Sequence, residues 1–398
     1  MNRTIRKIHL WLGLTCGLIA SFSGLTGSLY VWQPELSAFL NPDLLQVEDF
    51  GNLDDRTIME TTASLVAIHG DSINSMFLPY REQQTISITF NNGKTSYYHP
   101  ETHAYLGKKS ASIRFFENLL VLHRTLGIPT FGKYIVGTSA IIFFLFLLTS
   151  GFYIWATSYR NNLKEGFTIQ WKGKRKKINF DLHKTFGAYF MVPLLIMALS
   201  GSYFTYNSYY KSALGLFDGK RDSTGLEAPR PWAHGDSPRL LDYLSKTNES
   251  YALRAIHFPK NGTDHYRLRY IKERFITSGL RRTKEVELDA NGHVTVVSDF
   301  RTDPNSNRMA TQFYPIHIGE MAGTIGRILV FVSGLVPLLL FLTGLNIYRN
   351  KKRRKTGKKN GMQNSPQSQL HHIPTLGPEN RGGEDQLRLF SGNKQRDA

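Results

Sequence analysis

Residues 9–28 read HLWLGLTCGLIASFSGLTGS, and residues 183–202 read HKTFGAYFMVPLLIMALSGS. Each stretch begins with a histidine, has a glycine four residues later and ends in a Gly-Ser pair. The matching positions are His9, Gly13 and Gly27 in the first stretch, and His183, Gly187 and Gly201 in the second. Matches at fixed spacing inside otherwise apolar segments indicate an internal repeat.

A second pair of segments repeats in the same way. In residues 121–132, VLHRTLGIPTFG, His123 is followed nine residues later by Gly132, and Gly326 follows His317 at the same distance. Each segment then runs to a closing glycine, in LLTSGFYIW and in LFLTGLNIY, with a one-residue slip between the copies. We therefore interpret the chain as an internal duplication, in which each copy consists of a helix, a polar lobe and a second helix.

Four stretches are apolar over about 20 residues, the length that a helix needs to cross a bilayer. They are residues 10–32, 134–155, 188–206 and 328–348. The first follows the basic sequence MNRTIRK, but it is too long for a cleaved signal peptide and no A-x-A site follows it, so we expect an uncleaved anchor. Pro193 and Pro337 are expected to kink the third and fourth spans.

The placement of charge predicts the orientation of these spans. The net charge of the 398 residues is +18. Between Ser158 and Lys184 eight basic residues face two acidic ones, and after Tyr348 twelve basic residues face four acidic ones. Because Lys and Arg concentrate on the cytoplasmic side, we expect both termini and the middle loop there, and both long polar segments on the other side. Basic runs beside spans have this explanation, so we expect no nucleic-acid partner.

The two polar segments resemble each other. Apolar residues at three- and four-residue steps predict helices over residues 56–69 and 238–246. Short alternating strands follow each helix, with turn signals at Asn92-Gly93 and Asn291-Gly292. The simplest fold for each lobe is a helix laid on a small antiparallel meander.

The expected fold is thus membrane α-helical, a four-helix transmembrane bundle with two α+β lobes. The expected segments are 1–33 (N-terminus and first span), 34–122 (first lobe), 123–157 (second span), 158–182 (basic loop), 183–206 (third span), 207–316 (second lobe), 317–348 (fourth span) and 349–398 (a basic, disordered tail).

Four histidines fall at the borders of these spans. The predicted topology puts His9 and His183 at one depth, and His123 and His317 together at the opposite face. Paired imidazoles on facing helices are what a bundle needs to hold a planar macrocycle with one ligand on each side of its iron. The chain has no C-x-x-C-H sequence and its one cysteine is Cys16, so a covalently attached haem is excluded.

Other interpretations of these residues remain open. A histidine at a membrane border is often only an interfacial polar residue, and glycine in a span often serves close helix packing. Gly13, Gly187, Gly132 and Gly326 fit either close packing or the approach of a flat ring. Arg124 and Arg327 could balance haem propionates or extend to the interface as many basic side chains do. His99 and His103 are better explained by a polar turn than by a zinc site.

The elements IRKIHLWLGLTCGLIASFSGLTGSLYVWQPEL, LHRTLG and DLHKTFGAYF resemble the PepSY-associated transmembrane proteins of the bacterial inner membrane. The resemblance covers about residues 1–350. It implies that both lobes are periplasmic, PepSY-like modules. The best-understood branch of that family is the ferric-siderophore reductases, which carry two haem groups. By that resemblance, His9 and His183 would hold an inner haem b, and His123 and His317 an outer one.

The resemblance also implies a function. Electrons would pass from a cytoplasmic or quinol donor to a ferric siderophore in the periplasm, which would release Fe(II). We expect the chelate to dock between the lobes, near the second histidine pair, where aromatic residues and arginines are plentiful: Tyr97, Tyr98, Phe313, Tyr314, Arg267 and Arg269. Two alternatives remain: a membrane-anchored PepSY module that binds, inhibits or scaffolds another protein, and a haem carrier.

Overall fold

The structure is a computed structural model that describes residues 3–48, 50–218, 240–246, 250–259, 265–275, 278–289 and 293–363. Three of the sequence-based expectations fall outside these residues, wholly or in part. They are the Asn291-Gly292 turn, the start of the second lobe helix at residues 238–239, and the tail beyond residue 363.

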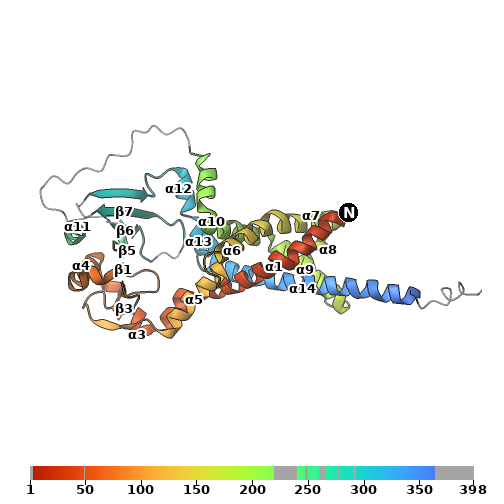
Figure 1. Cartoon of the computed structure of the whole chain (residues 1–398), viewed down its shortest axis with the longest axis horizontal. Helices are drawn as coiled ribbons and strands as arrows, with labels where there is room; N and C mark the ends of the chain where they lie inside the picture. The colour runs from red at the N-terminus through yellow and green to blue at the C-terminus, as the bar shows by residue number, and fades with distance from the viewer. Residues whose placement is uncertain are drawn as a thin grey trace, which may run out of the picture. The chain divides into compact units, whose positions relative to one another are not determined.

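The described residues contain three helices that are long and apolar enough to cross a membrane, and a bent pair that would make a fourth. The long spans cover Arg3–Val31, Gly132–Tyr159 and Glu320–Arg353. They correspond to helix α1 (Arg3–Val31), to the run α6 (Gly132–Ile142), η3 (Phe143–Leu148) and α7 (Thr149–Tyr159), and to α14 (Gly323–Gln363). Three of the four predicted spans are therefore single runs of helix, which lie together in Figure 1.

The third predicted span is broken instead of straight. It consists of α9 (Arg175–Tyr189) and α10 (Met191–Gly215), which meet at an angle of 62°. The break lies at Phe190, three residues before Pro193, because proline disfavours continuation of the preceding helix. The predicted kink is confirmed there, whereas α14 continues through Pro337 as one helix.

The second span contains a turn of π-helix. Residues Phe143–Leu148 form η3 between two α-helical segments, and Phe143 and Leu147 are buried in a cluster with Leu194 and Val336. A π turn accommodates more residues than an α turn, since its hydrogen bonds run from i to i+5. The fourth span has no such turn among its described residues. The π turn therefore accounts for the one-residue slip between the two sequence repeats.

The polar segments form one antiparallel sheet of eight strands. The strands are β1 (Ile73–Phe77), β2 (Ile86–Phe90), β3 (Thr95–Tyr98), β4 (Tyr105–Lys108), β5 (Ala252–His257), β6 (His265–Ile271), β7 (Thr283–Asp289) and β8 (Val294–Asp299), in the order β4-β3-β2-β1-β5-β6-β7-β8. Each polar segment contributes one meander, as predicted. The sequence did not indicate that Met76 of β1 pairs with Ile256 of β5, so that the two meanders share one sheet.

The two lobe helices cover this sheet. Helices α4 (Asp55–His69) and α11 (Leu240–Lys246) pack against each other, as Figure 1 shows. Side chains from both helices and from the central strands form one core, including Ile58, Leu65, Met76, Leu244 and Ile256. The predicted turn after β2 is present, with Gly93 at φ 77°.

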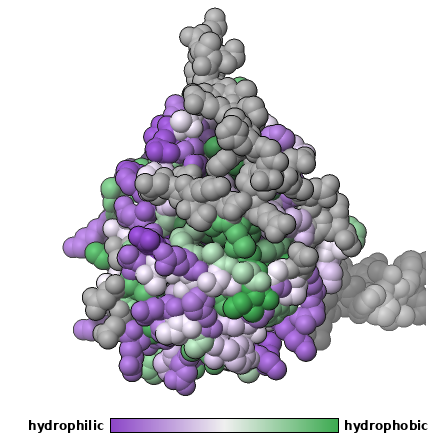
Figure 2. Space-filling model, turned by 90° about the vertical axis from the view of Figure 1, so that its left-hand side faces the viewer, coloured by the Kyte–Doolittle hydropathy of each residue, from purple (hydrophilic) through white to green (hydrophobic). Residues whose placement is uncertain are grey.

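Further helices link these elements. Helix α8 (Leu163–Phe167) lies between α7 and α9, at the end of the spans away from the sheet. The others lie between the spans and the strands or beside α4: α2 (Gln33–Leu40), α3 (Pro42–Leu45), η1 (Phe50–Asn52), η2 (Gly70–Ser72), α5 (Ala111–Thr125), α12 (Asn305–Ala310), α13 (Phe313–His317) and η4 (Glu320–Ala322). Seen from the sheet end, the surface is mostly hydrophilic around a smaller hydrophobic area (Figure 2). This contrasts with the exposed apolar side chains of the spans, such as Leu18, Phe146 and Leu342.

Candidate functional site

The structure brings the four predicted histidines together in two pairs. His9 of α1 faces His183 of α9, with ring centroids 6.4 Å apart and an interplanar angle of 84°. His123 of α5 faces His317 at the end of α13, with ring centroids 6.1 Å apart and an interplanar angle of 45°. We call these the first and the second histidine pair. In each pair one ring comes from each half of the chain.

These spacings fit two imidazoles on opposite sides of one metal ion. A metal–imidazole bond is about 2 Å long and the ring centre lies about 1 Å beyond the nitrogen, so the ring centres would be roughly 6 Å apart. The observed separations of 6.4 and 6.1 Å agree with that value. Direct hydrogen bonding between two rings would place them closer, because donor and acceptor would be only about 3 Å apart.

The Nδ1 atom of each histidine has a hydrogen-bond partner on a neighbouring span. His9 Nδ1 lies 2.9 Å from Ser150 Oγ, and His183 Nδ1 lies 3.0 Å from Thr343 Oγ1. In the second pair, His317 Nδ1 lies 2.9 Å from Ser200 Oγ. His123 Nδ1 lies closer to a backbone carbonyl than to a hydroxyl, at 2.8 Å from the carbonyl of Ser23 and 3.4 Å from the hydroxyl of the same residue.

These partners determine the tautomer of each ring. The hydroxyls of Ser150, Thr343 and Ser200 donate to carbonyl groups of their own helices, so they accept from the histidines. A backbone carbonyl can only accept, so His123 Nδ1 must also donate. All four Nδ1 atoms therefore carry the proton, and the lone pair is on Nε2. Within the described residues the hydrogen bonds of these rings all involve Nδ1, which leaves Nε2 for a ligand.

A glycine lies against each of the four rings. A Cβ atom on Gly27 would be 2.7 Å from His123 Cε1, and one on Gly201 would be 3.0 Å from His317 Cε1. The corresponding distances are 3.2 Å from Gly151 to His9 and 3.3 Å from Gly344 to His183. Each ring thus occupies space that a larger residue would close. Within each half of the chain, a glycine on each span therefore contacts the histidine that belongs to the other span.

The other predicted glycines do not touch the histidines. A Cβ atom on Gly13 or Gly187 would make ordinary contacts with Leu147 or Leu340, at 3.7 and 3.8 Å. Gly132 approaches the backbone of Thr125, and Gly326 approaches that of Gly319, so closely that a Cβ atom would collide with a carbonyl oxygen. Each carbonyl belongs to the residue two positions after a paired histidine. Gly132 and Gly326 therefore allow the backbone after the second pair to pass close to the start of the following span.

The two predicted arginines have different surroundings. Arg124 is exposed on α5. Arg327 forms a two-pronged ion pair with Glu35 and lies over the ring of Trp32, 4.6 Å from its centroid. Trp32 and Glu35 belong to the sequence WQPEL, so this motif anchors the end of the first span to the start of the fourth. The charge of Arg327 is already balanced there.

A cluster of buried arginines lies beside the second pair, and the sequence analysis missed it. Arg81 and Arg281 both bind the carboxylate of Glu320, each at 2.6 Å, and both lie over the ring of Tyr314. Arg254 lies 4.1 Å from the ring centroid of Tyr80. Burial is the main cause that lowers the pKa of Arg254, and repulsion by Arg281 and Arg81 adds to it.

This buried cluster carries more positive than negative charge. Among the described residues, its three guanidinium groups share one carboxylate, that of Glu320, and the Nε atoms of Arg81 and Arg281 have no hydrogen-bond partner. The cluster adjoins the second pair, since Tyr314 lies on the same short helix as His317 and Phe204 contacts both rings. A buried excess of positive charge favours an anionic group nearby.

The six residues expected to dock a chelate are engaged in packing. Tyr97 and Tyr98 are buried, and Phe313 stacks on Tyr203 with ring centroids 4.3 Å apart. The remaining three lie in the arginine cluster (Tyr314) or in ion pairs with Glu285 and Glu287 on the sheet (Arg267 and Arg269). His99 is part of a polar turn, where its Nδ1 accepts hydrogen bonds from Glu101 and Thr102.

Apolar helices joined to a polar sheet domain define a membrane protein with a sizeable extramembrane part. A sequence model of the PepSY-associated TM region matches residues 6–351, so the chain belongs to that family. No curated protein shows significant similarity to the chain.

Proposed function

We propose that this protein is a di-haem b oxidoreductase of the bacterial inner membrane that reduces ferric siderophores in the periplasm. The observation that supports the proposal is that the four imidazole rings face each other in two pairs. Every Nδ1 atom is hydrogen-bonded, and every Nε2 atom is available for a ligand. A packing role would not require the same tautomer at four separate positions. The proposed orientation follows from the basic segments, with both termini cytoplasmic.

The residues around each histidine pair would have separate roles in binding a cofactor. A haem b at each pair would supply a one-electron carrier near each face of the apolar layer. The four Nε2 atoms would ligate, while the hydroxyl and carbonyl partners keep each ring in one orientation. The adjoining glycines leave room for the rings. The buried arginines Arg81, Arg254 and Arg281 would hold the anionic propionates at the second pair, in place of Arg327, which is occupied by Glu35.

The overall reaction transfers one electron to each ferric ion. The donor, a quinol or a cytoplasmic reductant, loses that electron, and the chelating oxygens keep their electron pairs and take up protons as Fe(II) leaves. Hard oxygen donors bind Fe(III) better than Fe(II), so reduction loosens the complex. The relation between the halves, in which each contributes one ring to each pair, is what an internal duplication would produce.

The test is an absorption spectrum of the detergent-purified full chain, with haem counted against protein. We expect two low-spin haem b groups per chain, and we expect His9→Ala and His123→Ala each to lose one of them. His293→Ala is the matched control, because His293 is exposed just before β8 and bonded to Asp289. Right-side-out membrane vesicles should then reduce an impermeant ferric chelate added outside.

Two results would contradict the proposal. A colourless protein from haem-replete cells would favour the alternative of a PepSY module that binds or scaffolds another protein. A protein that contains haem but loses it rapidly to apomyoglobin, and leaves external chelates oxidised, would favour a haem carrier.

A further inference from the structure

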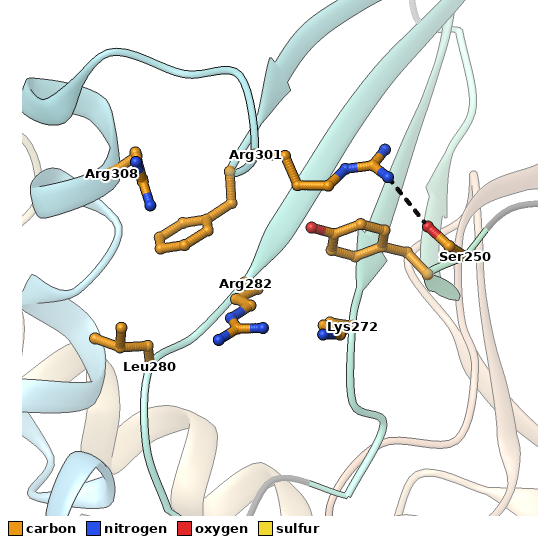
Figure 3. Close-up of a pocket in the computed structure, with 8 residues that line it drawn as sticks. Ser250, Lys272, Leu280, Arg282, Arg301 and Arg308 are labelled. Carbon is orange, nitrogen blue, oxygen red and sulfur yellow. Dashed lines mark hydrogen bonds between the residues drawn. The ribbon is translucent and has the colours of Figure 1, made fainter.

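A pocket of about 520 Å³ opens in the sheet domain, and its lining contains none of the six residues expected to dock a chelate. Basic and aromatic side chains dominate its lining: Lys272, Arg282, Arg301, Arg308, Tyr251 and Phe300. Figure 3 shows Arg282 and Lys272 on one side of the space and Arg301 and Arg308 on the other. The four cations come from three separate stretches of the chain, and the fold brings them to one place.

Among the described residues, most of the positive charge in this pocket has no acidic partner. Arg301 bonds to Asp299, at 2.9 Å. Within the part of the chain that the structure describes, no carboxylate forms an ion pair with Lys272, Arg282 or Arg308. The described lining holds four cations and no acidic residue, so it creates a positive potential that attracts an anion. Guanidinium groups bind carboxylate or phenolate oxygens with directed hydrogen bonds.

The pocket also offers flat surfaces. Arg301 lies over the ring of Tyr251, with its Cζ 5.3 Å from the centroid, and Arg308 lies over Phe300 at 4.9 Å. Guanidinium planes and aromatic rings both stack against aromatic ligands. The combination suits a ligand that is both aromatic and anionic better than it suits a compact inorganic anion.

The wall of the pocket is connected to the second histidine pair. Buried Gln312 accepts a hydrogen bond from the backbone N–H of Arg281 and donates one to its carbonyl, at 3.0 and 2.9 Å. Arg281 lies between Leu280 and Arg282 of the pocket wall, and Gln312 directly precedes α13, which ends at His317. Gln312 also donates a hydrogen bond to the backbone carbonyl of Arg308 on α12, at 3.3 Å. A ligand in the pocket would therefore be held in fixed relation to the second pair.

We propose that this pocket binds the ferric chelate, and that the preferred chelates are anionic complexes with aromatic oxygen donors, of the catecholate class. The inference rests on the proposed function for the identity of the metal complex, whereas the charge and rings of the pocket define its ligand class. A trianionic tris-catecholate complex matches the pocket, and a neutral tris-hydroxamate complex does not use its charge.

The test uses the full chain in detergent and redox-inert gallium complexes, so that binding is measured without electron transfer. Isothermal titration calorimetry would compare Ga(III) tris-catecholate with Ga(III) tris-hydroxamate. We expect the catecholate complex to bind more tightly. We expect the double variant Lys272→Gln/Arg282→Gln to lose about tenfold in its affinity, while Arg282→Lys alone retains most of it. Lys94→Gln is the control, because Lys94 is exposed at the β2–β3 turn.

Unchanged catecholate binding in a folded double variant would overturn the inference, and so would tighter binding of the hydroxamate complex. Thermal unfolding of each variant separates loss of binding from loss of fold. The two proposals can fail separately. Binding at the pocket by a protein that contains no haem would leave the pocket standing and remove the reductase. Reduction of ferric chelates without binding at the pocket would do the opposite.

Discussion

Thr343 Oγ1 lies 3.0 Å from Nδ1 of His183, and it donates its own proton to the carbonyl of Leu339. The hydroxyl therefore accepts from the ring. Replacement by valine would keep the shape and remove the acceptor. Loss of such a partner lowers metal affinity about 10- to 100-fold in other metal sites, so Thr343→Val should weaken haem binding at the first pair by a similar factor.

The measurement is haem retention and the reduction potential of each haem by spectroelectrochemical titration. Thr343→Ser should restore both values, because it keeps the hydroxyl. A valine variant with wild-type potentials would show that the hydrogen bond has no influence on the ring.

Gly27 offers the tightest approach to a histidine ring. A methyl group there would lie 2.7 Å from His123 Cε1. Because overpacking of this kind costs about 1–3 kcal/mol, we expect Gly27→Ala to displace the ring and to remove the second haem while the first remains. Gly215→Ala is the control, since nothing lies within 4 Å of a Cβ atom at that position of α10. Retention of both haem spectra in Gly27→Ala would count against the assigned role of this glycine.

The π turn of the second span aligns Ser150 and Gly151 with His9. Helix α14 presents Thr343 and Gly344 to His183 without such a turn, so the π turn accommodates the one residue by which the second span is longer. We expect deletion of Leu145 to restore a regular α-helix, to keep Ser150 and Gly151 beside His9 and to leave both haem spectra unchanged. Deletion of Leu335 from α14, which has no π turn to absorb it, rotates the following segment by roughly 100° and should remove the first haem. Loss of the first haem in the Leu145 deletion would contradict this role of the π turn.

Glu320 is the one carboxylate bound by both Arg81 and Arg281, and all three side chains are largely buried. Glu320→Gln leaves two buried cations without a counter-charge, so we expect a loss of about 3–5 kcal/mol in the free energy of unfolding. The exposed pair Arg56–Glu60 provides the comparison, because Glu60→Gln should cost less than about 1 kcal/mol. Denaturant titration followed by circular dichroism would measure both. Equal costs would mean that the buried cluster has little structural role.

The stability of the sheet domain should fall in acid. Burial acts to raise the pKa of Asp299, but the hydrogen bonds from the side chain and backbone of Arg301 outweigh it and lower the pKa. A carboxyl group whose pKa is lower in the folded state stabilises the fold above its unfolded pKa, about 3.9, and that contribution is lost as the pH falls through the folded value. At neutral pH the Asp299→Asn variant should be less stable than wild type. As the pH falls below about 4, the variant should lose less of its stability than wild type does. An identical pH profile for both proteins would disprove this assignment.

The sequence predicted the spans and the histidine pairs because each depends on local chemistry. Apolar length defines a span, and a repeat at fixed spacing relates His9 to His183 without knowledge of the fold. The bend at Phe190 was also accessible, since Pro193 follows it. The serine and threonine partners could have been found in the same way, because Ser150-Gly151, Ser200-Gly201 and Thr343-Gly344 are hydroxyl–glycine pairs.

Three features depend on contacts between distant segments, and no local pattern in the sequence indicates them. The arginine cluster combines Arg81 and Arg281, which are about two hundred positions apart, with Glu320. The basic pocket likewise joins separate stretches. Arg327 was singled out for its position beside a conspicuous glycine, and its ion pair with Glu35 on another helix is a contact of the same long-range kind.

The pairing of β1 with β5 has a further consequence for how the chain could be divided. Each half alone would expose an unpaired strand at its edge, along which chains readily associate. In the intact protein each half covers the other, from Ser75 against His257 to Phe77 against Ala255. The two halves, expressed as separate chains in the same cell, should therefore associate. Either half expressed alone should tend to aggregate.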